Sequence, residues 1–319
     1  MSDIPPVSGV GCIFGPVPSR RLGRSLGIDL VPAKTCSYDC SYCQIGRTTA
    51  HTVERRRWCD PQDILRQLPE RLGSVPDYIT LSGAGEPTLY DGLGELIAGI
   101  KSLTDIPVAV ITNGSLLWRA DVRAELMGAD LVAPSLDAGD AATFTAINRP
   151  VAELDFARMV RGLIEFRRQY DGKYWLEIFL IRGVNDSDAA VRALVKLAAR
   201  IAPDRIQLNT VLRPPADTGL QPVPLNRLRE LASRFSPPGE IIAEFSAAGG
   251  VGGSAQPADV LEMIRRHPCA CEDISSGLGI AAGRAQELLQ LLQQQGLIRS
   301  ILQGGRTYYM AIENQITPP

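Results

Sequence analysis

The chain lacks several features that would mark it as a specialised class of protein. No apolar run approaches the ~20 residues that a membrane-spanning helix needs. Residues 1–11 have no basic stretch followed by an apolar one, so we expect no secretory signal peptide and a cytoplasmic location. Internal repeats and long low-complexity tracts are absent. With 45% hydrophobic and 21% charged residues, the composition excludes a disordered, collagenous or coiled-coil chain.

An excess of charge is also absent. The formal net charge is −2 and the isoelectric point about 5.8, so the overall field does not indicate binding to nucleic acid or to an anionic membrane. The seven cysteines are an odd number in a chain without a signal peptide, which argues against a disulfide framework. The length of 319 residues predicts roughly two domains, with enough chain to bury a core without disulfide or metal staples.

Short apolar runs alternate with amphipathic stretches between residues 27 and 245. The runs are rich in Val, Ile and Leu, which is typical of strands buried on both faces. Pro61 suits the first turn of a helix, and Ser187 suits an N-cap before Asp188. We predict strands at residues 27–31, 78–82, 107–112, 131–135, 174–181 and 205–210, and helices at 61–72, 93–103, 119–127, 154–170, 188–201 and 225–235.

Six β–α units in succession predict an α/β fold with a parallel sheet and right-handed crossovers. The periodicity fits both a doubly wound sheet and an open or partial (β/α)6 TIM-like barrel. In either fold, the chemistry belongs at the carboxyl ends of the strands. This rule singles out the polar residues that follow each predicted strand.

A Gly-rich stretch at residues 246–256 (SAAGGVGGSAQ) predicts a flexible linker and a domain boundary. Beyond it we predict helices at 258–266, 272–278 and 281–295, then strands at 297–302 and 306–312 joined at Gly304-Gly305. Three helices and a hairpin form the winged-helix layout. The predicted domains are therefore residues 1–245, the linker at 246–256 and a winged-helix-like domain at 257–319.

Three of the cysteines, Cys36, Cys40 and Cys43, lie within eight residues, directly after the first predicted strand. Thiolates are soft ligands that select zinc, copper(I) or iron–sulfur clusters. Structural zinc requires four ligands, and neither His51 nor Cys59 completes a familiar spacing. Three thiolates suit a [4Fe–4S] cluster with one iron open to a small molecule. A zinc knuckle and unligated core cysteines are the plainer alternatives.

The segment CSYDCSYC at residues 36–43 resembles the signature of the radical S-adenosylmethionine (SAM) superfamily. The resemblance implies a [4Fe–4S] cluster and SAM as cofactors, with Tyr42 helping to hold the adenine and a partial barrel as the fold. It also implies that one electron, from a donor such as flavodoxin or ferredoxin, cleaves SAM at the open iron. The resulting 5′-deoxyadenosyl radical then abstracts hydrogen from a substrate. The resemblance does not designate a catalytic side chain.

Polar residues follow three of the predicted strands, where the superfamily places its SAM contacts. Residues 82–87 (SGAGEP) resemble the GGE-type motif, so Gly83, Gly85 and Glu86 are expected to meet the methionine ammonium. Asn113 follows the next strand, and an Asn-Gly turn is the alternative explanation for it. Ser135 and Asp137 follow the fourth strand and are candidates for contacting the ribose. For Glu86 and Asp137, the alternative is a loop carboxylate at the start of a helix.

Other polar residues near the expected site have alternative interpretations. Glu177 lies inside an apolar strand, which requires either partners on the inner face or exposure on the outer one. Asn209 and Arg213 follow the last strand and are candidates for binding substrate or SAM. Arginines bracket the triad and predict either an anionic substrate or a solvated face with local salt bridges; they are Arg20, Arg21, Arg24, Arg47, Arg55, Arg56 and Arg57.

Residues 14–218 resemble a bacterial radical SAM group that is classed with the wyosine-forming tRNA enzyme 4-demethylwyosine synthase. They include the segments ITLSGAGEPTL, AVITNGSLLW and QLNTVLRPPAD. The chain departs from that synthase in two respects. Only Cys12 precedes the triad, where the synthase has three further cysteines. Lys34 is the only upstream lysine and lies too near the triad to match the lysine that captures pyruvate.

The C-terminal domain leaves its partner open between a protein or peptide and nucleic acid. Few basic residues occur there, with Arg284 on the longest helix and Arg306 on the hairpin, whereas a DNA reader needs a basic patch. Cys269 and Cys271 either bind a metal or sense the redox state, or they are packed in the interior without such a role. The leading hypothesis is a radical SAM enzyme that acts on an unidentified substrate, with tRNA and a peptide or protein as the sharper candidates. The alternative is an iron–sulfur redox-sensing winged-helix transcriptional regulator.

Overall fold

A computed structural model describes residues 12–73, 75–242 and 255–312. Its central feature is an eight-stranded sheet in the order β1-β2-β5-β6-β7-β8-β9-β10. All neighbouring pairs are parallel except β1 and β2, which form an antiparallel hairpin. The strands are β1 (Ile13–Ser19), β2 (Gly23–Ile28), β5 (Tyr78–Leu81), β6 (Val108–Thr112), β7 (Leu131–Pro134), β8 (Lys173–Leu180), β9 (Arg205–Thr210) and β10 (Gly239–Ile241).

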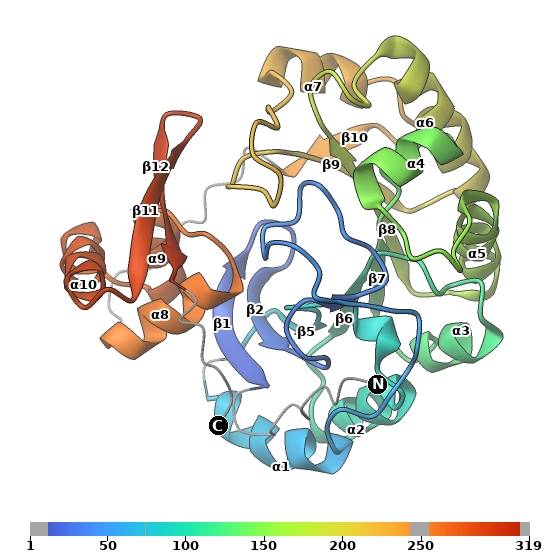
Figure 1. Ribbon diagram of the computed structural model, residues 1–319. Helices are drawn as coiled ribbons and strands as arrows, with labels where there is room; N and C mark the ends of the chain where they lie inside the picture. The colour runs from blue at the N-terminus through green and yellow to red at the C-terminus, as the bar shows by residue number, and fades with distance from the viewer. Residues whose placement is uncertain (1–11, 74, 243–254, 313–319) are drawn as a thin grey trace.

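Helices follow the strands along the chain and cover the outer side of the arc that the strands form (Figure 1). Pro61 stands at the start of α1, and the Ser187 side chain accepts a hydrogen bond from the Ala190 amide at the start of α6, as predicted. The helices of this layer are α1 (Pro61–Arg71), α2 (Leu93–Leu103), α3 (Ala120–Leu126), α4 (Ala141–Asn148), α5 (Phe156–Gln169), α6 (Asp188–Ile201) and α7 (Leu225–Ala232).

The α/β class and the parallel sheet are confirmed, but the first predicted strand is wrong in its bounds. It begins earlier, at Gly23, and ends at Ile28 as β2, because Asp29 leaves the sheet and accepts a hydrogen bond from the Ala84 amide. The strand β1, which contains Pro16 and Pro18, was not among the predicted strands. Proline cannot donate to a strand ladder, so such a segment is tolerated at a sheet edge, where β1 lies.

The main core lies between the sheet and its outer helices. Ile79 of β5, Val110 of β6 and Ile97 of α2 are at most 1% exposed and belong to one large cluster of buried side chains. A smaller cluster, made of Leu22, Ala109, Leu131, Ala133 and Trp175, fills the inner face of the arc. The first cluster fixes the helices on the sheet, and the second supports the chemistry-bearing residues from the inside.

The C-terminal segment forms a module with its own core beside β1 (Figure 1). Its elements are α8 (Pro257–Arg266), α9 (Cys271–Leu278), α10 (Ala282–Gln294), β11 (Ile298–Gln303) and β12 (Arg306–Ala311), and the two strands pair antiparallel around Gly304-Gly305. The three predicted helices and the hairpin are thus present. Val17 of β1 packs against the core of the module. Most of the predicted linker lies outside the described residues.

The helices in the described part of the chain are all too short or too polar to cross a membrane.

Candidate functional site

The cysteine triad lies in the loop between β2 and α1, which a short parallel pairing of β3 (Thr35–Cys36) with β4 (Ala50–His51) partly orders. All three thiols are free and half-buried. Burial raises the pKa of the Cys36 thiol to about 12, and that of Cys40 well above its usual range. The pKa of Cys43 is also raised by burial, but the backbone N–H groups of Ile45 and Gly46 oppose this shift. A metal would therefore have to supply the positive charge that holds these sulfurs as thiolates.

Amide side chains donate to two of these sulfurs. The Asn113 Nδ2 atom lies 3.5 Å from Cys36 Sγ, and the Asn148 Nδ2 atom lies 3.5 Å from Cys40 Sγ. Hydrogen bonds to sulfur are a usual feature of iron–sulfur sites, where they tune the cluster. Sequence reasoning missed Asn148, which ends α4 and lies 108 residues from Cys40 in the chain.

The loop after β5 is packed tightly against the triad loop. Gly83 has a φ of +135°, and a Cβ there would lie 1.6 Å from Asp29 Oδ1. A Cβ on Gly85 would lie 2.2 Å from the carbonyl oxygen of Thr35. Only glycine fits either position. The two predicted glycines thus let the backbone of this loop approach the cysteine loop.

Glu86 is buried, with 2% exposure, and joins the ends of two strands. Its Oε1 atom accepts from Thr88 and from the Thr112 hydroxyl, and its Oε2 atom accepts from the Asn113 amide at 2.7 Å. Burial raises the pKa of the carboxyl, while these hydrogen bonds oppose the rise. Because Oε2 has a single donor, it retains a lone pair for a further ligand.

Asp137 is the second buried carboxylate, with 3% exposure. Its Oδ2 atom accepts from the Tyr42 hydroxyl at 2.5 Å and from Asn148 Nδ2 at 2.7 Å, and Oδ1 accepts from the Phe179 amide. Burial raises the pKa of Asp137 to about 6. Tyr42 also stacks on the Phe179 ring, with centroids 3.9 Å apart. The residue before the third cysteine is therefore fixed to both β7 and β8.

In the described part of the chain, Glu86 and Asp137 are held by neutral hydrogen-bond donors. Among the residues that the structure describes, no arginine, lysine or histidine forms an ion pair with either carboxylate. A buried charge without a partner is costly, so such a pair suits a cationic ligand. SAM carries an ammonium and a sulfonium, and a cluster with an open iron suits three thiols. The donor set therefore fits both groups.

A single metal ion fits less well. Within the described ranges, no group of three or more His, Cys, Asp or Glu side chains is arranged to hold one ion. A cluster offers a separate iron to each cysteine, so its ligands need not converge on one point. The two residues considered as a fourth ligand have other contacts. His51 Nε2 lies 3.2 Å from the Ser37 carbonyl oxygen, and the Cys59 sulfur forms a hydrogen bond with the Cys12 thiol.

The remaining predicted residues lie at the same edge of the sheet. Asn113 bridges the strand end to the triad loop, because its Nδ2 atom also lies 2.9 Å from Ser37 Oγ. Ser135 is at the end of β7 and forms a parallel bridge with Glu177. Glu177 has partners on the inner face, accepting from Arg21 at 2.6 Å and from Asn209 at 3.1 Å. Of the two alternatives for Glu177, the structure thus supports the inner one.

Most of the arginines near the triad form local ion pairs. Arg47 contacts Asp39 and Asp217, Arg55 contacts Glu125, and Arg57 contacts Glu95. These ion pairs support the interpretation of the arginines around the triad as a solvated face with local salt bridges. Arg20 differs from them, as described below.

The cysteine pair of the C-terminal module is packed within that module. Cys269 is buried, and its sulfur lies 3.2 Å from His267 Nδ1. The Cys271 thiol lies 3.6 Å from the carbonyl oxygen of Ala282. These contacts account for both thiols without a metal.

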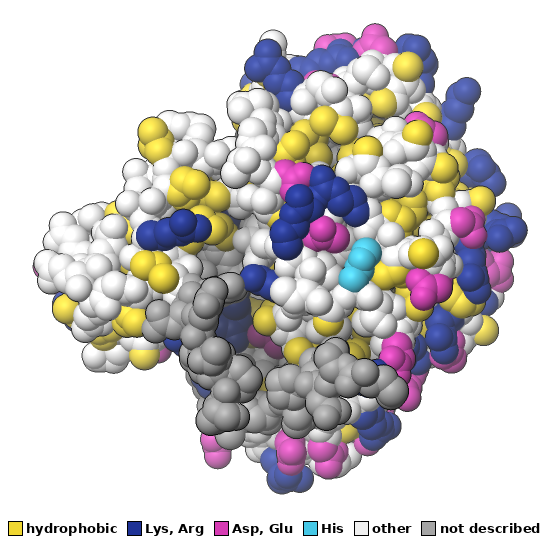
Figure 2. Space-filling model, viewed as in Figure 1, with side chains coloured by type: hydrophobic (Ala, Val, Ile, Leu, Met, Phe, Trp, Pro, Cys, Tyr) yellow, Lys and Arg dark blue, Asp and Glu magenta, His cyan; other side chains and the backbone are white. Residues whose placement is uncertain are grey.

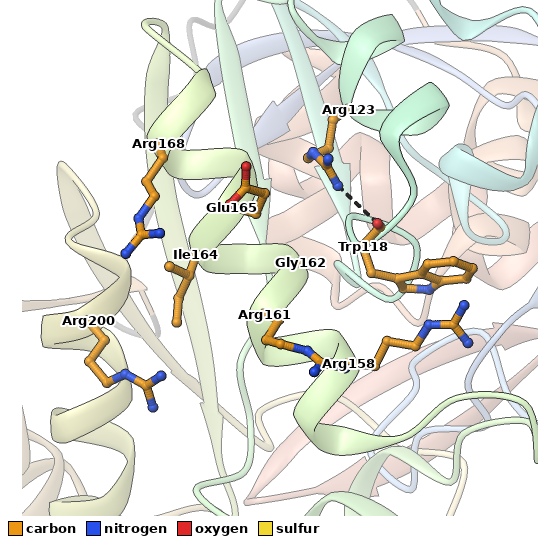
Figure 3. Close-up of a pocket in the computed structure, with 9 residues that line it drawn as sticks. All are labelled: Trp118, Arg123, Arg158, Arg161, Gly162, Ile164, Glu165, Arg168 and Arg200. Carbon is orange, nitrogen blue, oxygen red and sulfur yellow. Dashed lines mark hydrogen bonds between the residues drawn. The ribbon is translucent and has the colours of Figure 1, made fainter.

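A separate groove of about 520 Å³ lies on the outer helical layer (Figure 3). Arg158 covers the Trp118 ring at 3.2 Å from its centroid. Arg158, Arg161, Arg168 and Arg200 line the groove and form no ion pair with another described residue. None of the predicted site residues lines it, so this basic groove is distinct from the strand-end site.

Comparison with known proteins gives the following likenesses. A sequence model of the Radical SAM superfamily matches residues 30–195, which contain the triad and the strand ends described above. A UPF0026 protein of Methanocaldococcus jannaschii is 32% identical over 309 residues, covering 93% of this chain and 95% of that protein. A UPF0026 protein of Synechocystis sp. is 37% identical over 203 residues, covering 63% of this chain and 76% of that protein.

Two further matches differ in extent. The protein named GTPase Obg of Brachyspira hyodysenteriae is 40% identical over 303 residues, covering 93% of this chain, but the match spans only 45% of that protein. Among solved structures, a radical SAM methyltransferase from Sphaerobacter thermophilus superposes with a TM-score of 0.51 at 17% identity, covering 68% of this chain and 65% of that chain. The likeness to this solved structure shows that the two chains share a fold.

Proposed function

The chain belongs to the radical SAM superfamily and to the UPF0026 family, and we propose that it binds SAM and a [4Fe–4S] cluster at the strand-end site to abstract hydrogen from a substrate, with tRNA or a peptide or protein as the candidates. The observation that carries this proposal is the meeting of three thiols with two buried, cation-free carboxylates at one edge of the sheet. When bound, the two groups supply one-electron cleavage of SAM and hydrogen abstraction.

The residues divide between the two groups by their chemistry. The thiols of Cys36, Cys40 and Cys43 would hold the cluster. The remaining contacts would hold SAM: Gly83, Gly85 and Glu86 at the methionine end, Asn113 beside it, Ser135 and Asp137 at the ribose, and Tyr42 at the adenine. Asp137 supports this assignment because its Oδ1 atom has only one donor and retains an acceptor position.

Apolar side chains next to Tyr42 would keep water from the reacting end of the site. Ile147, Phe179, Ile181 and Val211 form a buried cluster against which Tyr42 packs. Excluding water prevents side reactions of reactive species. Phe179 also orients Tyr42 by stacking, so the same residue shields the site and fixes the adenine wall.

The two cofactors require an electron donor and a reducing compartment. Radical SAM enzymes need a reductant, and a flavodoxin or ferredoxin would supply single electrons. Three thiols that must stay reduced to hold the cluster, and a reducible cluster, require a reducing compartment, which supports a cytoplasmic location.

We further propose a partial (β/α)6 barrel over residues 1–245, a linker at 246–256 and a winged-helix-like domain at 257–319. Arg306 of that domain pairs with Glu272 at 2.9 Å, and Arg284 pairs with Glu287 at 3.1 Å. The side chains of the module that face the viewer in Figure 2 are mostly uncharged. These observations favour a protein or peptide partner over DNA for this domain.

The alternative function, an iron–sulfur redox-sensing regulator, receives no support from the comparisons. Arg284 of the longest helix and Arg306 of the hairpin, two of the cations such a regulator would use on DNA, are already engaged in ion pairs. The 4-demethylwyosine synthase grouping likewise finds no support among the relatives.

Anaerobic reconstitution with iron and sulfide tests the proposed function. The reduced protein should convert SAM to 5′-deoxyadenosine, and total tRNA or small peptides supplied as candidate pools should raise turnover if they contain the substrate. Reduced protein that holds a full cluster and SAM but releases no 5′-deoxyadenosine would contradict the proposal.

A further inference from the structure

Arg20 lies in the turn between β1 and β2, and no described carboxylate lies within ion-pair distance of its guanidinium. Its Nη1 atom lies 3.5 Å from the Asn209 side-chain oxygen, and within the described ranges it forms no ion pair. Burial, together with the nearby charges of Arg213 and Arg21, lowers the pKa of Arg20 to about 10, and the more distant attraction of Glu177 and Asp273 only partly opposes this shift. A desolvated guanidinium bound only to a neutral amide lacks the anion that normally offsets its burial.

The neighbours of Arg20 leave one positive charge in excess. Arg21 is neutralised by Glu177 at 2.6 Å, and Arg213 lies 3.6 Å from Asp273. Three guanidiniums therefore face two carboxylates. Asp273 also contacts Arg306 at 3.4 Å, which divides its charge further. One further anionic group would balance the charge of this arginine cluster.

This cluster adjoins the strand-end site. Arg213 Nη1 donates to the Gln44 side-chain oxygen at 3.3 Å, and Gln44 directly follows Cys43. Glu177 acts electrostatically on both Tyr42 and Asp137. An anion held by Arg20 and Arg213 would thus sit next to the proposed SAM site.

The C-terminal module forms one wall of this cluster. Asp273 lies on α9, which packs against β1, and His267, just after α8, acts electrostatically with Arg213 and Arg20. Arg266 of the same module contacts Asp29 at 3.3 Å. The module therefore adjoins the chemistry instead of standing apart from it.

We propose that Arg20 and Arg213 bind an anionic group of the substrate, a carboxylate or a phosphate, between the inner face of the sheet and the C-terminal module. Guanidinium forks bind both groups through paired hydrogen bonds. The inference rests on the proposed function, because it assigns the substrate class of the same site. It makes the module a wall of the substrate pocket.

Calorimetric titration of the reconstituted, SAM-saturated protein tests the inference, with inorganic phosphate and acetate as separate probes. One of the two should bind saturably, and the one that binds identifies the substrate group. Arg20→Gln should weaken this binding about tenfold or more, since hydrogen bonds to charged groups are strong. Arg192→Gln, at an exposed position of α6, is the matched control and should bind as the wild type does.

Two further variants guard against misfolding. Arg213→Gln should weaken binding as Arg20→Gln does, and Arg20→Lys should retain part of it, because lysine keeps the charge without the fork. Binding of neither probe to the wild type, or equal affinity in Arg20→Gln, would overturn the inference. Binding seen only without SAM would also overturn it, because these arginines would then hold the SAM carboxylate. The release of 5′-deoxyadenosine by the wild type is scored separately, so failure of the proposed function is distinguishable.

Discussion

The hydroxyl of Tyr42 donates a hydrogen bond of 2.5 Å to Asp137 Oδ2, across 95 residues of sequence. This bond fastens the cysteine loop to the end of β7. Asn148 donates to the same oxygen and also reaches Cys40 Sγ. One buried carboxylate therefore orients both Tyr42 and a donor to the triad.

Asp137 gives a prediction about pH. Burial raises its pKa to about 6, above the value of about 3.9 in an unfolded chain. The folded state therefore retains a proton that the unfolded state releases, so the stability that this group contributes is full below pH ~4 and is lost as the pH rises through about 6. The loss should be on the order of 3 kcal/mol. Urea unfolding of the cluster-free protein at about pH 4 and pH 7 measures it, and Asp137→Asn should remove this part of the slope. Identical slopes in the two proteins would refute the role of Asp137.

The triad gives a prediction about metal content. Alanine at Cys36, Cys40 or Cys43 should abolish the visible absorbance, the bound iron and SAM cleavage, because two thiolates do not retain a cluster that needs at least three. Iron and sulfide analysis after reconstitution measures this. Cys271→Ala, in the C-terminal module, is the control and should retain all three signals. A full cluster in Cys40→Ala would exclude Cys40 as a ligand.

Gly83 gives a prediction about the loop after β5. Gly83→Ala would place a Cβ against Asp29 in a backbone conformation that costs a non-glycine residue about 1–3 kcal/mol. The variant should therefore unfold at lower urea concentration and bind SAM more weakly. Gly73→Ala is the matched control, since a Cβ there meets nothing within 4 Å. Unchanged SAM affinity in Gly83→Ala would separate this loop from the SAM site.

Arg266 gives a prediction about the C-terminal module. Its guanidinium contacts Asp29 at 3.3 Å and lies 3.8 Å above the Phe14 ring. Arg266→Ala would leave the Asp29 carboxylate buried without its cation, which should cost about 2–3 kcal/mol of unfolding free energy. Because Asp29 also holds the Ala84 amide, SAM affinity should fall as well. The adjacent exposed Arg265, replaced by Ala, should change neither quantity.

Local patterns in the sequence were sufficient to predict the triad and the strand ends. Cys36, Gly83, Glu86 and Asp137 are each recognisable from their neighbours in the chain, and the parallel-sheet rule brings the strand ends together. Asp29 and Arg266 are 237 residues apart in sequence, so no local pattern could reveal their contact. Their pairing depends on where the module packs.

Asn148 and β1 were missed for different physical reasons. Asn148 ends a helix, where an asparagine is an ordinary residue, and only its tertiary position brings it to Cys40 and Asp137. The prolines of β1 argue against a central strand, and an edge strand could not be foreseen without the sheet order. Both cases show tertiary context deciding what local composition leaves undetermined.

The two edges of the sheet differ in how they are protected from other chains. β10 has only three residues, which leaves little backbone for another strand to pair with. β1 has seven residues, and α9 packs beside it while Val17 enters the core of the module. A truncated chain that ended before α8 would uncover this longer edge together with an apolar side chain, which favours aggregation through strand addition.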